Sequence, residues 1–97
     1  MSKLVVVAKV VAKKEFLSHV KSSLLNLIVP TRQEDGCIDY TLHQDNDDPS
    51  VFVFYETWEN PDCLENHLQT DHYKAHAKAV QGKIEDKEVF KMTRIEV

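Results

Sequence analysis

Two segments of this chain, residues 3–11 and 51–59, carry bulky apolar side chains at both odd and even positions. Their β-branched and aromatic content predicts strands. A strand that is apolar on both faces is usually covered on both sides in the folded protein. These two segments therefore predict the centre of a sheet, with helices on one face and a second cover on the other.

The first helix follows the first strand directly. From Lys13, apolar side chains recur at helical spacing as far as the pair Asp35-Gly36. Pro30 is expected to kink this helix or to start a new turn, because proline lacks an amide hydrogen. Gly36 is expected to take the left-handed position that closes the element.

A hairpin comes next. Residues 37–44 alternate as a half-buried strand, and the polar residues 45–49 form a turn that joins them to residues 51–59. The alternation predicts three side chains on the buried face of the first of these strands: Ile38, Tyr40 and Leu42.

The last third of the chain predicts two short helices and a strand. Asn60-Pro61 is a helix start, with an N-cap followed by proline. Asp71 opens a second helix, and residues 87–97 predict the final strand. The apolar stripe of the second helix is expected to comprise Tyr73, Ala77, Val80 and Ile84.

The order β-α-β-β-α-β predicts a single α+β domain over residues 1–97, with a ferredoxin-like fold and a four-stranded antiparallel sheet. Its helices cover one face, and the other face keeps large apolar side chains. Patches of that size rarely stay exposed on a monomer. A second copy related by a two-fold axis presents the same face, so we expect a homodimer.

Composition excludes several function classes. The net charge is −4 and the basic residues are scattered, so we expect no nucleic-acid partner. The apolar run at residues 4–8 is too short to span a bilayer or to form a signal-peptide core. We therefore expect a cytoplasmic protein without a membrane partner. Cys37 and Cys63 are expected to be free thiols, and two glycines make a classical nucleotide loop implausible.

A series of short motifs extends over most of the chain. These are Glu34-Asp35-Gly36-Cys37, then Tyr40, Leu42 and His43, then Asp48-Pro49, Phe54-Tyr55-Glu56-Thr57-Trp58, and Leu64-Glu65-Asn66-His67-Leu68 with His72. Their order and spacing resemble the antibiotic biosynthesis monooxygenase family. Within that family, Ile28-Val29-Pro30-Thr31 and His67-Leu68-Gln69-Thr70 are similar to stretches of the small bacterial quinol-monooxygenase-like proteins.

The resemblance implies a dimeric α+β barrel with a pocket between the sheet and the helices of each subunit. It also implies a monooxygenase that joins dioxygen to a quinol or aromatic phenol without flavin, metal or another cofactor. Two alternatives stay open. One is a haem-binding protein of the same superfamily, and the other is a non-enzymatic module that binds a small ligand under stress. An isomerase is also compatible with the fold, because a fold does not set a reaction.

The candidate catalytic residues are His67, His76 and Trp58, and a third histidine, His72, lies between the first two in the sequence. His67 or His76 is expected to act as the general base, since histidine titrates near neutral pH. His72 and His76 stand one helical turn apart, which suits zinc, but no third ligand is obvious and we expect no metal site. The alternative for each of the three histidines is that it is an ordinary polar residue beside an apolar stripe. Trp58 matches the tryptophan that lines the pocket in the family, or it simply packs the end of a strand.

Further residues are expected to shape the pocket. Glu56 lies between aromatic residues, so its carboxylate is expected to pair with Arg94 or Lys91, or else to have a raised pKa. His76 resembles the haem ligand of the haem-degrading branch, but the first strand lacks that branch's asparagine. The residues expected to bind the substrate are Tyr40, Phe54, Tyr55, Glu56, His72 and Tyr73.

Overall fold

The computed structural model describes residues 3–96. Along the chain, its elements are β1 (Leu4–Ala12), η1 (Lys14–Phe16), α1 (Leu17–Arg32), β2 (Cys37–Gln44), β3 (Val51–Trp58), α2 (Pro61–Leu68), α3 (Asp71–Ala79) and β4 (Ile84–Met92). This is the predicted β-α-β-β-α-β order with the second helical segment divided in two. No helix within residues 3–96 is long and apolar enough to cross a membrane.

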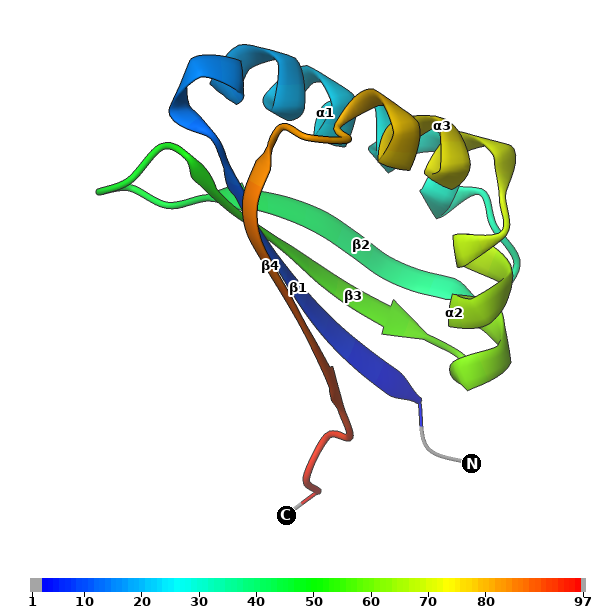
Figure 1. Cartoon of the computed structure of the whole chain (residues 1–97). Coiled ribbons are helices and arrows are strands. Elements are labelled where there is room, and N and C mark those ends of the chain that lie inside the picture. Colours follow the sequence, from blue (N-terminus) through cyan, green and yellow to red (C-terminus); the bar gives the residue numbers. More distant parts are fainter. Residues whose placement is uncertain (1–2, 97) are drawn as a thin grey trace.

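The sheet has the order β2-β3-β1-β4, and each neighbouring pair is antiparallel. The predicted ferredoxin-like α+β fold is therefore confirmed. Helices α1 and α3 lie side by side over one face, and α2 closes one end of that layer (Figure 1). The register pairs Val6 on β1 with Glu56 on β3 and with Lys91 on β4. Because paired residues share a face, these three side chains form one row across the sheet.

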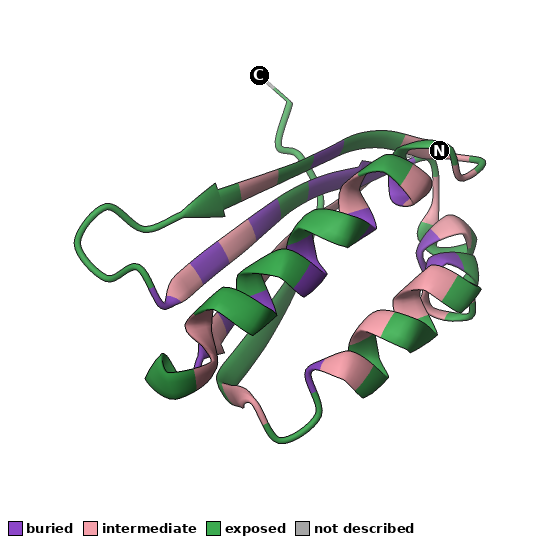
Figure 2. Ribbon diagram, turned by 90° about the horizontal axis from the view of Figure 1, so that it is seen from above, coloured by how far each residue is buried: buried purple, intermediate pink, exposed green. Residues whose placement is uncertain are grey.

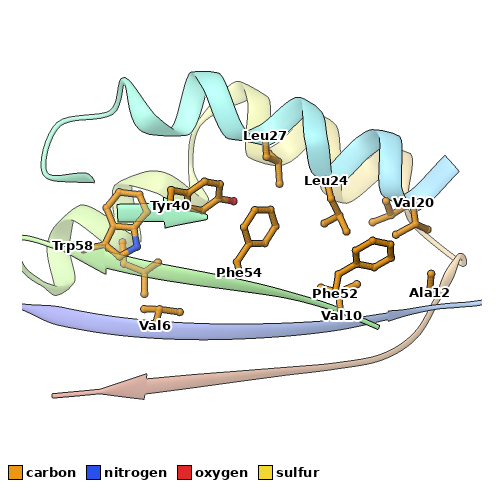
Figure 3. Close-up of a cluster of buried hydrophobic side chains, with 12 residues drawn as sticks. Val6, Val10, Ala12, Val20, Leu24, Leu27, Tyr40, Phe52, Phe54 and Trp58 are labelled. Carbon is orange, nitrogen blue, oxygen red and sulfur yellow. The ribbon is translucent and has the colours of Figure 1, made fainter. Parts of the chain in front are cut away.

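The core lies between the sheet and α1. Phe52, Phe54 and Trp58 alternate along β3 and point toward the helices, where they meet buried leucines such as Leu24 and Leu27 of α1 (Figure 3). On α1, buried residues lie on the side that faces the sheet, and the outward side is exposed (Figure 2). Helix α3 has intermediate and exposed residues but no buried one. Both faces of β3 thus carry large apolar side chains, as predicted, and Tyr55 lies on the side away from the helices.

The face of the sheet away from the helices carries a second apolar surface. Val7 at its centre pairs with Tyr55 on β3 and with Phe90 on β4. Tyr55 and Phe90 are 42% and 47% exposed, and the neighbouring Met92 is 42% exposed. All three helices lie on the other side of the sheet (Figure 1). The predicted homodimer would cover this surface, and it stays a prediction.

The predicted start of α2 and the predicted turn after α1 are confirmed. Asn60 accepts a hydrogen bond from the backbone of Cys63 and caps α2, and Gly36 has the expected positive φ, 81°. A Cβ atom at Gly36 would overlap the sulfur of Cys63, so the turn needs glycine for space as well as for conformation. Helix α1 continues through Pro30 as far as Arg32. The proline lies in the last turn, where its missing N–H costs only one helical hydrogen bond.

The predicted bounds of the last strand and the predicted buried position of Ile38 were wrong. The last strand comprises Ile84–Met92 rather than residues 87–97, because Ile84 begins the pairing with β1 and α3 already ends at Ala79. Val97, the end of the predicted strand, lies outside the described residues. Ile38 does not share the buried face of Tyr40, because the register of β2 shifts between Cys37 and Asp39 and leaves Ile38 41% exposed.

Candidate functional site

A cavity of about 310 Å³ lies between the sheet and the helices. This volume is in the range of small-molecule sites. Most of the wall is apolar, and the polar side chains that line it are Glu56, His67, Tyr73, His76, Lys87 and Lys91, together with the phenol Tyr40. Sequence reasoning had named all of these except Lys87. The cavity therefore combines an apolar interior with a few titratable groups.

Glu56 is the buried carboxyl of this cavity. Its side chain is 5% exposed, and its Oε1 accepts a hydrogen bond of 2.9 Å from the indole N–H of Trp58. The predicted ion pair is wrong: no basic side chain of residues 3–96 forms a salt bridge with Glu56, and Arg94 instead approaches Glu96 at the surface, 3.8 Å away. Lys91 lines the same cavity without pairing.

The environment of Glu56 moves its pKa toward neutrality. Burial raises the pKa from 4.5 to about 7, and the charge of Glu34 adds to this rise. The Trp58 N–H and the charge of Lys87 act in the opposite direction. A carboxyl with this pKa is present in both protonation states near pH 7, so it can accept and return a proton.

Trp58 lies behind the cavity rather than in its wall. It is fully buried and is not among the lining residues, so the expectation that it lines the pocket is wrong. Its ring packs 5.0 Å from the His67 ring, centroid to centroid. Trp58 and Glu56 are two positions apart on one strand and therefore share a face. The tryptophan packs the strand end and holds the Glu56 carboxyl by its N–H.

His67 and His72 converge on a carboxylate that sequence reasoning had missed. Oε2 of Glu34 lies 2.7 Å from Nδ1 of His67 and 2.6 Å from Nε2 of His72. Both imidazoles donate an N–H to this oxygen. His67 lines the cavity, while His72 is partly exposed and does not. The expected contact of His72 with a substrate stays a prediction.

The three side chains come from different parts of the fold. Glu34 lies in the turn between α1 and β2, where its N–H donates to Thr31 and its carbonyl accepts from Cys37. Thr70 joins α2 to α3, because its hydroxyl donates to the carbonyl of His67 and accepts from the N–H of Tyr73. These bonds fix both the carboxylate and the angle between the two short helices. Glu34 is far from both histidines in sequence, and only its place in the Glu34-Asp35-Gly36-Cys37 motif could have drawn attention to it.

His76 belongs to a different contact. Its Nδ1 lies 2.7 Å from the hydroxyl of Ser23 on α1. Burial and the charge of Lys87 lower its pKa to about 4, so the ring is neutral and is a weak base near pH 7. His72 and His76, whose spacing suits zinc, are each hydrogen-bonded to a different residue: His72 to Glu34 and His76 to Ser23.

Aromatic rings line the cavity beside His67. Tyr40 stacks on Phe54 with 4.5 Å between ring centroids, and Tyr73 packs edge-on against His67 at 5.0 Å. Burial raises the pKa of Tyr40, so its phenol stays protonated and can donate a hydrogen bond. Tyr55 is on the opposite face of the sheet, so its predicted contact with a substrate in this cavity is wrong.

Two lysines mark the β4 side of the cavity. Lys87 donates a 3.1 Å hydrogen bond from Nζ to the hydroxyl of Tyr73, and Lys91 follows on the same face of the strand. Both lysines and the intervening Val89 are exposed. A ligand that becomes an anion in the cavity would meet positive charge on this side.

The antibiotic biosynthesis monooxygenase family matches residues 3–79 of this chain. The chain belongs to this family. This chain spans only part of the length of the individual proteins to which it is similar. Protein sll1783 of Synechocystis is 34% identical over 61 residues, which are 63% of this chain and 39% of that protein. A protein of Escherichia coli named "Probable quinol monooxygenase YgiN" is 39% identical over 66 residues, which are 59% of this chain and 64% of YgiN.

Solved structures of other proteins share the fold of this chain over nearly its whole length. The crystal structure of PA3566 from Pseudomonas aeruginosa superposes with a TM-score of 0.95 at 26% identity, and the match covers 99% of this chain and 97% of that one. The ferredoxin-like architecture of residues 3–96 is therefore the architecture of known relatives.

Proposed function

We propose that this protein oxidises a small quinol or aromatic phenol with dioxygen, without flavin or metal. The observation that carries the proposal is Glu56, a buried carboxyl with a pKa near 7 that faces an apolar cavity and has no cationic partner among the described residues. Membership of a monooxygenase family and the similarity to YgiN support the reaction class. The cavity volume of about 310 Å³ suits one or two fused rings.

The reaction begins with a proton transfer. Ionised Glu56 takes the proton of a quinol hydroxyl, which makes the ring electron-rich. The carboxyl can act in this way because its pKa is close to the working pH. Lys87 and Lys91 stabilise the quinolate from the β4 side, and the protonated Tyr40 can donate a hydrogen bond to one of its oxygens.

The quinolate itself then reduces dioxygen. One electron passes from the ring to dioxygen, and the resulting ring radical and superoxide combine to form a carbon–oxygen bond. Loss of water from the hydroperoxide leaves a hydroxyquinone. One oxygen atom of dioxygen enters the ring and the other leaves as water, so quinol and dioxygen balance hydroxyquinone and water without another reductant. The protein supplies the base, the positive charge and an apolar wall that excludes water.

The test is oxygen uptake by the metal-stripped protein with a panel of reduced benzoquinones and naphthoquinones, after autoxidation in buffer is subtracted. We expect saturable uptake and a hydroxyquinone product. Glu56→Gln keeps the shape and the acceptor for Trp58 but cannot take a proton, so uptake should fall by about 100-fold or more. His43→Gln is the matched control, because His43 is exposed and is bonded to the Val53 carbonyl away from the cavity.

The outcomes separate the candidates for the base. Loss of uptake in His67→Gln with full activity in Glu56→Gln would return that role to the histidine predicted from the sequence. Uptake no faster than in buffer with every quinol would refute the oxygenase. Tight binding of a quinol without turnover would instead identify the non-enzymatic binding module.

Haem binding through His76 is the second candidate. The neutral ring lines the cavity, and Ser23 holds its Nδ1, which leaves Nε2 as the free nitrogen. Histidine ligands of metals commonly have their second nitrogen held in this way. Titration with hemin should then give a Soret band that is lost in His76→Ala. An unchanged spectrum would exclude this candidate.

We further propose that two copies pair through the sheet face that contains Val7, Tyr55 and Phe90. These residues form one apolar row across the three strands β3, β1 and β4. Sedimentation should give a dimer for the wild type and a monomer for Tyr55→Glu or Phe90→Glu. Leu25→Glu is the matched control, because Leu25 is 50% exposed on α1 and lies on the helical side. A monomeric wild type would refute the pairing.

A further inference from the structure

We propose that Glu34, His67 and His72 form a binding site for a divalent transition metal ion, with Zn²⁺ as the best-suited ion. Each residue offers one ligand atom, and the three atoms all lie within 4.8 Å of one another. Among the residues that the structure describes, this is the one group of three or more histidine, cysteine or acidic side chains with that convergence.

The spacing of the ligand atoms is close to that of a metal site. The carboxylate oxygen of Glu34 lies 2.7 Å and 2.6 Å from the two imidazole nitrogens, which are hydrogen-bond distances. Ligands of a tetrahedral zinc ion, with bonds of roughly 2.0–2.1 Å, lie about 3.3 Å apart. Each oxygen–nitrogen distance therefore has to lengthen by about 0.6–0.7 Å, and the two nitrogens, which lie within 4.8 Å of each other, have to reach a similar separation. The ion then replaces the two protons that the oxygen now accepts.

The chemistry of the donors selects the kind of ion. Two imidazole nitrogens and one carboxylate oxygen suit zinc and other divalent transition metals, whereas Mg²⁺ and Ca²⁺ prefer oxygen ligands. Three protein ligands leave a fourth position of zinc to water or another small molecule. Two neutral imidazoles and one carboxylate also leave a single positive charge on the loaded site, which a partly buried location tolerates better than two.

The fold holds these ligands before an ion arrives. The turn that carries Glu34 is bonded on both sides, to Thr31 and to Cys37, and Thr70 locks the corner between α2 and α3. The His67 side chain is 3% exposed, that of Glu34 is 12% and that of His72 is 26%. An ion can therefore approach from the side of His72, which is the ligand with the most freedom to adjust.

The proposed ion site is separate from the carboxyl that carries the proposed function. Only His67 belongs both to the trio and to the cavity wall, and Glu56 is held by Trp58 instead. Metal binding is measured without turnover, and oxygen uptake is measured on metal-stripped protein. Either proposal can therefore fail without affecting the test of the other.

The experiment is calorimetric titration of the metal-stripped chain with Zn²⁺, followed by titration with Co²⁺ as a spectroscopic substitute. We expect one ion per chain and the strong visible bands of four-coordinate Co²⁺. Loss of a ligand should weaken Zn²⁺ binding by at least ~100-fold in Glu34→Gln and in His72→Gln, more than the loss of an outer-shell contact does. Because the ion binds the folded state, it should also raise the melting temperature of the wild type.

His76→Gln is the matched control, since His76 lies one turn from His72 on α3 but is bonded to Ser23. Binding that survives in His76→Gln and is lost in the two ligand variants assigns the site to the trio. Binding lost in His76→Gln instead would place the ion on the pair His72 and His76 and would overturn the proposal. Equal, weak binding by all variants, with the spectrum of hydrated Co²⁺, would also overturn it and leave a purely hydrogen-bonded trio.

Discussion

Replacing Glu56 with glutamine should stabilise the protein at alkaline pH while it abolishes activity. Burial holds the pKa of Glu56 near 7, above its ordinary 4.5. The folded state therefore binds this proton more tightly than the unfolded state does. The stabilising effect of the neutral carboxyl is fully present below pH 4.5 and is lost as the pH rises through about 7.

The size of the effect follows from the two pKa values. The difference between 4.5 and about 7 corresponds to roughly 3 kcal/mol of free energy of unfolding once the carboxyl is ionised in both states. Glutamine is always neutral and still accepts the hydrogen bond from Trp58. We expect Glu56→Gln to exceed the wild type by about 2–3 kcal/mol near pH 8 and by less than about 1 kcal/mol near pH 5.

The assay is urea unfolding of both proteins at the two pH values, at one protein concentration so that any dimerisation contributes equally. The decisive quantity is the change in the stability difference between the two pH values. A stability difference that stays the same at both pH values would refute the reasoning, because it would show that the Glu56 carboxyl ionises as easily in the folded as in the unfolded chain. His43→Gln serves as the control, since its side chain is exposed.

Three further perturbations test individual contacts. Trp58→Phe keeps an aromatic ring but removes the N–H that lowers the pKa of Glu56, so the acidic limb of the pH–rate profile for oxygen uptake should move to higher pH; an unmoved limb would argue against the contact. Gly36→Ala should cost about 1–3 kcal/mol in urea unfolding, because φ is 81° and the new methyl group overlaps Cys63, and a Cys63→Ala background should recover part of that loss. Asn60→Ala should cost about 1 kcal/mol by removing the cap of α2, whereas a change below about 0.3 kcal/mol would mean that the cap is replaced by water.

The fold was predictable because the alternation of side chains and the capping and turn residues all indicate the same order of strands and helices. Alternating apolar side chains assigned both faces of β3, and the cap at Asn60-Pro61 and the turn at Gly36 were read from residue type alone. The predictions failed where strand pairing decides which element a residue belongs to or which face of the sheet it occupies. Ile84 fits the helical stripe of the residues before it, but it pairs with β1, and the register shift beside Ile38 depends on β3 rather than on the alternation of β2.

Sequence reasoning named several residues of the cavity but not their hydrogen-bond partners. His67, His76 and Glu56 all line one cavity, and their roles in it stay predictions. Their hydrogen-bond partners depend on distances between segments far apart in the chain, which periodicity does not report. Glu34 lies 33 residues from His67, and Ser23 lies 53 residues from His76. The hydrogen-bond partners and the burial of a side chain set its protonation state. Sequence reasoning therefore favoured a histidine as the general base, whereas the base that we propose is the carboxyl of Glu56.

The two sides of the cavity differ in how easily they can move to admit a ligand. On one side, two hydrogen bonds of the Thr70 hydroxyl tie α2 to α3, so that wall cannot move outward without uncapping a helix. On the β4 side, the boundary consists of the long exposed side chains of Lys87 and Lys91 around Val89. Exposed rotamers change within picoseconds to nanoseconds, whereas helix displacements take microseconds or longer. We therefore expect a ligand to enter on the β4 side, where side chains rather than the backbone have to move. Lys87 would release its hydrogen bond to Tyr73 in doing so.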